Sequence, residues 1–223
     1  MSFADRADAG RRLAAALARY EGRNAIVLAL PRGGVSVAKE VAAALGAAID
    51  LVLVRKIGVP MQPELAMGAV VDGPEPLVVR NDDVIALAGI SEAAFNRVRD
   101  REIAEIARRR SAYLGERPHP TVAGRVAIVV DDGIATGATM RAALRAVRRQ
   151  RPETLVLAVP VAPTSTLKDL ADEADEIVCL EDHETFGAIG FFYADFSQVS
   201  DREVTDILAA FPPEPAAAAR PSP

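Results

Sequence analysis

Five short runs of almost continuous Val, Ile, Leu and Ala recur along the chain, separated by turn residues and by stretches with helical spacing. Their apolar residues do not alternate with polar ones, so the runs predict strands that are buried on both faces of a sheet. The predicted strands cover residues 25–30, 50–54, 126–130, 154–160 and 176–180.

Apolar positions at helical intervals predict helices between these strands. The expected helices cover residues 3–20, 35–45, 138–150 and 164–174, and the first ends near Gly22. Strand, helix and strand in succession indicate right-handed crossovers and parallel pairing. The predicted fold class is therefore α/β, with a doubly wound, mostly parallel sheet.

Two regions depart from this rhythm. Residues 55–80 hold four prolines, and the apolar runs 66–71 and 76–80 flank Asp72-Gly73, which predicts a β-hairpin. A polar helix is expected at 91–114, where Ser91 and Glu92 form its start and opposite charges alternate along its length. We interpret this helix as a solvated surface helix.

These features predict one domain over residues 1–211, followed by a disordered tail. The core spans about 25–180, with an insertion at about 57–116 and a small hood at about 181–200. The tail, residues 212–223, is rich in proline and alanine, a composition that does not favour a packed core.

Composition narrows the class of protein. The chain has 223 residues, a net charge of −5, half its residues hydrophobic and one cysteine, so neither an intrachain disulfide nor a structural zinc site is expected. No run is apolar enough for a membrane span, the N-terminus lacks a leader pattern, and the acidic balance argues against generic nucleic-acid binding. We expect a cytoplasmic protein with no membrane or nucleic-acid partner.

The strongest chemical signal is VAIVVDDGIATGATM, residues 126–140. Asp131 and Asp132 emerge at the carboxyl end of a buried strand, where open α/β sheets bind ligands. The small, hydroxyl-bearing residues that follow lead directly into a helix, whose free N–H groups can hold a phosphate. They are Ala135, Thr136, Gly137, Ala138 and Thr139. An anion cradle beside two hydroxyl acceptors suggests a ribose 5-phosphate; the alternative is a strand end followed by a helix cap.

Residues 127–139 resemble the phosphoribosyl-pyrophosphate (PRPP) signature of type I phosphoribosyltransferases. The resemblance implies that Asp131 and Asp132 hold the ribose hydroxyls and that residues 135–139 hold the 5-phosphate. Many members carry Asp at the position of Ala135, whereas adenine-type members carry Ala. A catalytic carboxylate proposed at that position in some relatives is therefore absent from this chain.

A second motif is the turn Pro31-Arg32-Gly33-Gly34, which follows the first predicted strand. The glycines permit close approach of backbone N–H groups to an anion, and Arg32 offers a forked donor. An ordinary strand-to-helix turn is the alternative. In the resembled family the first such loop binds the pyrophosphate of PRPP, often across a non-proline cis peptide.

A third motif is Arg55-Lys56, followed by Gly58 and Pro60. Two adjacent cations at the end of a strand add positive potential, although a solvated turn gives the same pattern. Adenine-type members have a similar R-K-x-G segment that contacts pyrophosphate, and a flexible loop follows it.

The last motif is aromatic: residues 181–200 contain five of the ten aromatic side chains. Hypoxanthine-type members cover the base with a comparable stretch, so Phe186 is the candidate for base stacking. Phe191, Phe192 and Phe196 are expected to pack against the sheet. Asp195 is out of register with an acidic position of those relatives and is not assigned to a metal.

The resemblance implies transfer of the ribose 5-phosphate group of PRPP to a nitrogen acceptor, most simply a nucleobase in purine or pyrimidine salvage, with release of pyrophosphate. Arg32, Lys56, Asp131 and Asp132 would be the catalytic residues, Mg²⁺ would bind through PRPP oxygens, and a homodimer is expected. A non-catalytic PRPP or nucleotide sensor is the alternative. A hydrolase is disfavoured because His183, Ser36 and Ser91 form no nucleophile pattern.

Overall fold

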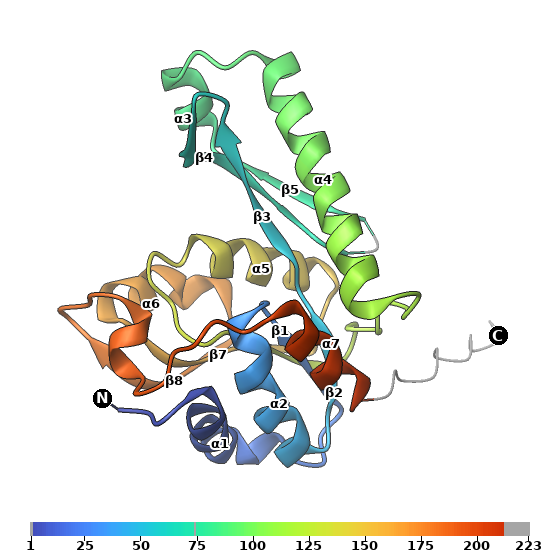
Figure 1. Ribbon diagram of the computed structural model, residues 1–223, viewed down its shortest axis with the longest axis vertical. Helices are drawn as coiled ribbons and strands as arrows, with labels where there is room; N and C mark the ends of the chain where they lie inside the picture. Colours follow the sequence, from blue (N-terminus) through green and yellow to red (C-terminus); the bar gives the residue numbers. More distant parts are fainter. Residues whose placement is uncertain (1, 74, 212–223) are drawn as a thin grey trace.

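The computed structural model describes residues 2–73 and 75–211, so the tail predicted at 212–223 lies outside the described residues. Within them, the core is a five-stranded parallel sheet with helices on both faces, which confirms the predicted fold class (Figure 1). The strands lie in the order β2-β1-β6-β7-β8. They are β1 (Ala25–Ala29), β2 (Ala48–Leu51), β6 (Val126–Val130), β7 (Thr154–Pro163) and β8 (Glu176–His183).

Helices cover both faces of this sheet because its central strands are apolar on both sides. In β1, Val27 and Ala29 pack into one hydrophobic cluster, and Ile26 and Leu28 pack into the other. One face is covered by α1 (Arg6–Ala16), α2 (Gly33–Leu45) and α7 (Asp201–Ala209), and the other by α5 (Ala138–Arg149) and α6 (Thr164–Leu170) (Figure 1).

Residues 2–3 lie against residues 192–194 beside the sheet. The N–H groups of Ser2 and Phe3 donate to the carbonyl of Phe192, and Ala194 N–H donates to the carbonyl of Phe3. Phe3 and Tyr193 are almost fully buried, with ring centroids 5.3 Å apart. The N-terminal segment is therefore part of the predicted hood, in which a short helix, η3 (Ile189–Phe192), precedes Tyr193.

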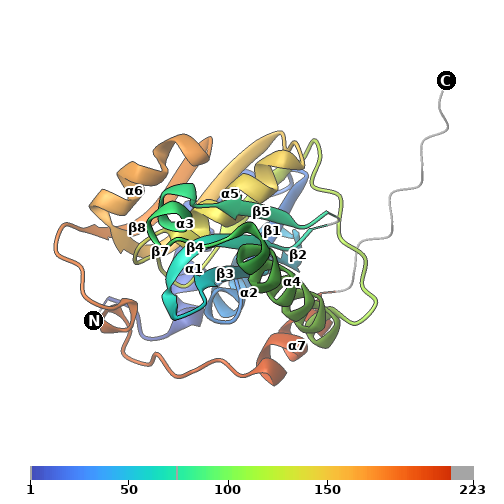
Figure 2. The ribbon, with the colours of Figure 1, turned by 90° about the horizontal axis from the view of Figure 1, so that it is seen from above.

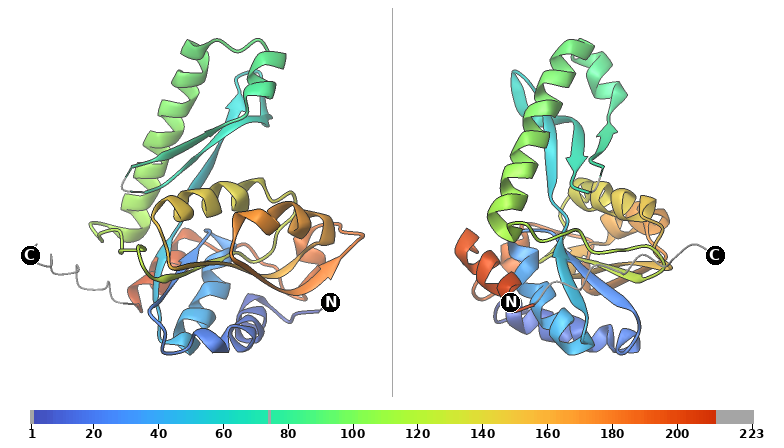
Figure 3. Two further views of the ribbon diagram at one scale, coloured as in Figure 1. Left: turned by 180° about the vertical axis from the view of Figure 1, so that it is seen from behind. Right: turned by 90° about the vertical axis from the view of Figure 1, so that its right-hand side faces the viewer.

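A second unit, which we call the arm, comprises residues 54–73 and 75–114 and projects from the core (Figures 1 and 3). Its antiparallel sheet consists of β3 (Val54–Val59), β4 (Gln62–Val71) and β5 (Leu77–Arg80). The helices α3 (Asp82–Leu87) and α4 (Glu92–Leu114) follow. The predicted hairpin is thus present as β4 and β5, and β3 is an additional strand beside it. From above, the arm lies over the core (Figure 2), and its strands β3 and β4 contact α5.

The predicted strand 50–54 is wrong at its end. The core strand β2 stops at Leu51, and β3 of the arm begins at Val54. Between them Val52 N–H still donates to Ala29 of the core, whereas the carbonyl of Leu53 accepts from Asp72 of the arm. The residues at this junction are buried, so the apolar run continues across it. Hydrophobicity alone therefore does not show where the chain passes from the core sheet to the arm sheet.

The helix predicted at 91–114 is confirmed in its bounds as α4, and Ser91 caps it, but it is solvated on one side only. The helix α4 packs on β3 and β4 through Phe95, Val98 and Ile106, which are buried. It also buries Glu102, which is 4% exposed. The helix supports the arm along its length and brings a buried charge to it.

The predicted helix 164–174 is shorter than expected, because α6 ends at Leu170 and a 3₁₀ turn covers Ala171–Glu173. Helix 3–20 likewise divides into α1, which ends at Ala16, and a 3₁₀ turn at Ala18–Tyr20. These differences lie at helix ends and do not change the topology.

Buried charges hold the base of the arm on the core. Arg110 of α4 donates to Asp72 at 2.9 Å and to Asp50 of β2 at 3.4 Å. Burial raises the pKa of Asp50, and the Arg110 charge opposes the rise. Because α4, β2 and the end of β4 share this cluster, the arm has a fixed attachment to the sheet. None of the described helices is both long and apolar enough to cross a membrane.

Candidate active site

The paired acids lie at the carboxyl end of β6, the central strand of the sheet. Asp132 is 8% exposed, and its N–H donates to Asp131 Oδ1 at 2.8 Å. Burial raises the pKa of Asp131 well above its usual range, and the adjacent Asp132 charge adds to the rise. Two carboxylates held this close need cationic or hydroxyl partners, which makes this position a candidate ligand site.

The loop predicted to hold a phosphate follows the acids and leads into α5. Gly137 has a φ of 75° and lies at the N-cap of that helix, so the first turn of α5 starts at Ala138. A Cβ at Gly137 would lie 2.7 Å from Thr166 Cγ2, and the Thr166 hydroxyl donates to the carbonyl of Ala135 at 2.9 Å. Packing against Thr166 of α6 therefore fixes the position of the loop. Exposed residues of the loop, which face solvent, are Ala135, Thr136, Ala138 and Thr139.

The turn at Pro31-Arg32-Gly33-Gly34 lies against the acids. The peptide between Pro31 and Arg32 is cis, as in the loop of the resembled family, and both glycines belong to the first turn of α2. A Cβ at Gly33 would overlap Asp132 Oδ2, and one at Gly34 would lie 2.9 Å from the Asp131 Cα. The sequence predicted two loops on one edge of the sheet, and the structure brings them into contact.

Arg32 lies beside this turn with its side chain 36% exposed. Its Nη1 is 3.7 Å from Oδ1 of Asp201, which begins α7 and also accepts from the Tyr113 hydroxyl at 2.7 Å. The contact between Arg32 and Asp201 is longer than a hydrogen bond. The guanidinium therefore remains available to an incoming anion.

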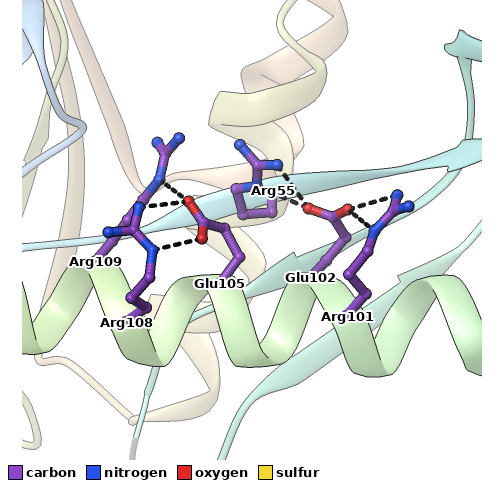
Figure 4. Close-up of polar contacts among 6 residues, drawn as sticks. All are labelled: Arg55, Arg101, Glu102, Glu105, Arg108 and Arg109. Atoms are coloured by element: carbon purple, nitrogen blue, oxygen red, sulfur yellow. Dashed lines mark hydrogen bonds and ion pairs between the residues drawn. The ribbon is translucent and has the colours of Figure 1, made fainter.

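Arg55 and Lys56 lie on β3, in the arm, and their environments differ. Arg55 donates to Glu102 Oε2 from Nε at 2.8 Å, and Nη2 of Arg55 is 2.7 Å from the same oxygen (Figure 4). Arg101 donates to the other oxygen of Glu102 at 2.9 Å. In the described part of the chain Lys56 pairs with Glu64, at 3.5 Å, and the Glu64 side chain is 97% exposed. Arg55 is held by α4, whereas Lys56 is the less constrained cation of the two.

Lys56 and the phosphate loop line one groove. This groove, of about 540 Å³, lies between the arm sheet and the start of α5 and includes Thr136 and Thr139. The groove has an apolar wall and charged residues of both signs. The apolar residues are Val54, Ala66, Ala69, Val79 and Ala142, and the further charged residues are Arg80, Arg141, Asp82 and Asp83. A second cavity of about 460 Å³ on the other side of β3 includes Arg55, Lys56 and Thr139. The arm thus brings Lys56 to the phosphate loop, although the two are 80 residues apart along the chain.

Phe186 lies in the hood, half-buried and stacked on Phe192 with ring centroids 5.0 Å apart. Phe192 also contacts the ring of His183 at 4.6 Å. One face of Phe186 is therefore occupied by another aromatic ring, and stacking on a base stays a prediction for its other face. Phe196 packs on Tyr193, as expected for core packing, whereas Phe191 is 72% exposed.

Three residues at the site had no signal in the sequence. Arg6 of α1 contacts Asp132 at 2.7 Å, the Tyr193 hydroxyl donates to the carbonyl of Asp132 at 2.6 Å, and Glu102 holds Arg55. Arg6 and Asp132 are 126 residues apart, and no pattern of spacing connects them. Only the folded chain shows these contacts.

Comparison with known proteins defines the class. The phosphoribosyl transferase domain family matches residues 3–195, so the chain belongs to that family. The five-stranded parallel sheet is therefore the core of a phosphoribosyl transferase domain.

Two individual relatives are similar to this chain over most of its length. The Mycobacterium tuberculosis protein Rv0571c, named as an inferred phosphoribosyl transferase, is 46% identical over 206 residues, which is 92% of this chain and 46% of the relative. The chain thus spans about half the length of this curated relative. The crystal structure of TT1426 from Thermus thermophilus superposes with a TM-score of 0.81 and 42% identity, covering 95% of this chain and 99% of that one. The superposition therefore extends over nearly all of both chains.

Proposed function

We propose that this protein transfers the phosphoribosyl group of PRPP to a nitrogen acceptor of the nucleobase class and releases pyrophosphate. The observation that carries the proposal is the contact between Gly33 and Asp132, which joins the two PRPP-type loops at one edge of the sheet. Family membership supports the same assignment.

The acid pair and the loop 135–139 are suited to hold ribose 5-phosphate. The N–H groups at the start of α5 and the hydroxyls of Thr136 and Thr139 can bind the phosphate, and the helix dipole favours its negative charge. Asp131 and Asp132 can accept hydrogen bonds from the two ribose hydroxyls when both are ionised. Fixing the sugar at both ends leaves C1 as the free reacting position.

In the reaction the bond between C1 and the pyrophosphate oxygen breaks, and its electron pair leaves with pyrophosphate. The lone pair of the acceptor nitrogen forms the new bond to C1, and the proton on that nitrogen passes to solvent. Arg32 and Lys56 are placed to neutralise the leaving group, because the acids near them in the described chain, Asp201 and Glu64, are exposed and no closer than 3.5 Å. Both residues are the catalytic cations of the proposal.

Mg²⁺ fits this site as a partner of the substrate. Among the described residues no group of three His, Cys, Asp or Glu side chains could form a metal cage, and one oxygen of Asp132 is taken by Arg6. Mg²⁺ keeps several waters and would bind mainly through the phosphate oxygens of PRPP, so it needs no such cage. When bound with PRPP, Mg²⁺ supplies charge neutralisation of the leaving group.

The first candidate surface for the acceptor is the groove of about 540 Å³ between the arm and α5, which has the volume of small-molecule sites. Its wall combines apolar residues with charged ones of both signs. The exposed face of Phe186 is the second candidate surface.

The test is to incubate the protein with PRPP, Mg²⁺ and a panel of purine and pyrimidine bases and to measure pyrophosphate release. Release with at least one base, absent without it, supports transfer. Tight PRPP binding without release for any base would favour a non-catalytic sensor. An absence of PRPP binding would refute both. When Lys56→Ala is assayed in the same way, its control is Lys39→Ala, which removes a lysine of α2 with a half-exposed side chain.

A further inference from the structure

Arg6 of α1 makes a close charged contact to the acid pair. Its Nε donates to Asp132 Oδ2 at 2.7 Å, and the two side chains are 11% and 12% exposed. A charge-assisted bond of this length, shielded from water, is stronger than a surface ion pair. Asp132 Oδ2 is also the atom that lies where a Cβ of Gly33 would be. Arg6 therefore acts on the oxygen that faces the pyrophosphate loop.

Arg6 has two further contacts within the hood. Its Nη1 donates to the carbonyl of Ser197 at 2.8 Å, and its guanidinium lies 3.9 Å from the centroid of Phe196. The Arg6 guanidinium is thus held by the Asp132 carboxylate, the Ser197 carbonyl and the Phe196 ring, and these three contacts fix the orientation of its plane. A side chain with so many constraints has one orientation, and it transmits that orientation to Asp132.

Tyr193 supports the same residue through its backbone. Its hydroxyl donates to the carbonyl of Asp132 at 2.6 Å, and its ring packs on Phe196 and Phe3. The acid pair at the end of β6 is therefore enclosed by residues from α1 and from the hood.

We propose that Arg6 is a positioning residue of the ribose-binding acid pair, which holds Asp132 in one rotamer and keeps its second oxygen free for a ribose hydroxyl. The inference rests on the proposed function. It extends the site to α1, which none of the motifs in the sequence includes. Arg6 itself contacts no substrate atom in this proposal.

The charge of Arg6 also acts on the neighbouring acid. It lowers the pKa of Asp131 against the larger rise that burial and Asp132 cause. Of the other charged or titratable groups, Tyr193 faces the pair, and Asp195 and Glu203 lie within range of Arg6, which contributes to the lowered pKa of each. Loss of Arg6 therefore removes the cation that offsets the repulsion between the two adjacent carboxylates.

The test compares PRPP binding in the presence of Mg²⁺ for the wild type, Arg6→Ala and Arg6→Lys by isothermal titration calorimetry. We expect Arg6→Ala to weaken binding at least tenfold. Arg6→Lys restores part of the loss, because an ammonium keeps the charge but not the fork. Arg11→Ala, an exposed arginine on the same helix, is the matched control and should bind as the wild type does.

Two readouts separate positioning from mere stability. As the solution is acidified, the Arg6→Ala variant should lose PRPP binding at a higher pH than the wild type does. Without the Arg6 charge, Asp131 takes up a proton more readily. In a double-mutant cycle, Arg6→Gln should add little to the loss that Asp132→Asn already causes. The lysine and glutamine variants keep the test usable if Arg6→Ala does not fold.

The outcomes are distinguishable. If the wild type binds PRPP and Arg6→Ala or Arg6→Gln binds it equally well at every pH, the positioning role is refuted and the proposed function stands. A fall in melting temperature with unchanged affinity has the same meaning and makes Arg6 a structural residue. If the wild type itself does not bind PRPP, the proposed function is refuted, and the inference with it.

Discussion

Oδ2 of Asp132 occupies the space above Gly33 and overlaps the position that a Cβ at residue 33 would take. No side chain fits at residue 33 unless the carboxylate moves. This relationship ties the geometry of the loop Pro31-Arg32-Gly33-Gly34 to that of Asp131 and Asp132 and provides the first prediction.

Gly33→Ala should weaken PRPP binding at least tenfold, because the new methyl group displaces the Asp132 carboxylate from its place between the loop and Arg6. The measurement is the Kd for PRPP with Mg²⁺. In the double variant Gly33→Ala/Asp132→Ala the clash is relieved, so the double variant should bind no worse than Asp132→Ala alone. Equal, additive losses from the two changes would contradict the account.

Asp132→Asn should weaken PRPP binding by one to two orders of magnitude, about 1.4–2.8 kcal/mol, because it removes a charged acceptor of the ribose hydroxyls. Affinity for inorganic pyrophosphate should change far less, since that ligand has no hydroxyl. Comparison of the two ligands by calorimetry checks this. Equal losses for both would show that Asp132 supports the pyrophosphate loop only.

Asp131→Asn should stabilise the protein without ligand at neutral pH. The folded-state pKa of Asp131 is raised, so the native protein binds the proton more tightly than the unfolded chain does. The group therefore favours folding at low pH, and stability falls as pH rises from the unfolded value of about 4 through the raised folded value.

The gain in melting temperature from Asp131→Asn should accordingly be larger at pH 7 than at pH 4, while PRPP binding is lost. Asp169→Asn, which changes an exposed acid on α6, is the control and should change neither. A destabilised Asp131→Asn at pH 7 would show that the carboxylate is favourably paired.

Lys56→Ala should lower kcat at least tenfold with a change in melting temperature of less than about 2 °C. Its side chain is 52% exposed and pairs with an almost fully exposed acid, Glu64, so folding gains little from it. Steady-state kinetics and thermal unfolding measure the two effects, with Lys39→Ala as the matched variant. A large loss of stability with normal turnover would make Lys56 structural.

Glu102→Gln should destabilise the protein by about 1–3 kcal/mol, because it removes the acceptor charge that holds Arg55 and Arg101. Glu105, three residues along, pairs with Arg108 and Arg109 on the exposed side of α4 (Figure 4). Glu105→Gln should cost less than about 1 kcal/mol. Equal effects of the two substitutions would mean that burial at Glu102 carries no weight.

Much of the core could be predicted from the sequence because each strand is buried on both faces. Ile26 and Val27 point into different clusters, so the run that contains them shows no alternation and can only be a central strand or a short buried helix. The short length of the run and the turn residues that follow it favour a strand. The junction between the core sheet and the arm sheet, at Val52 and Leu53, contains no polar residue, so the apolar pattern does not show where β2 ends.

The loops of the site could be predicted because parallel strands place their carboxyl ends on one edge. Gly33 and Asp132 follow adjacent strands, β1 and β6, and they meet. Contacts from outside these strands could not be predicted. Arg6 reaches Asp132 and Glu102 reaches Arg55 through tertiary packing, and a charged residue on a helix has the same sequence pattern whether it is solvated or buried.

Titration of the wild-type protein with PRPP and Mg²⁺, followed by addition of a nucleobase while pyrophosphate is measured, tests the central claim most directly. The account predicts saturable binding that Asp132→Asn weakens, and pyrophosphate release that requires both PRPP and a base. Binding that is absent, or that is the same in the wild type and in Asp132→Asn, would contradict it.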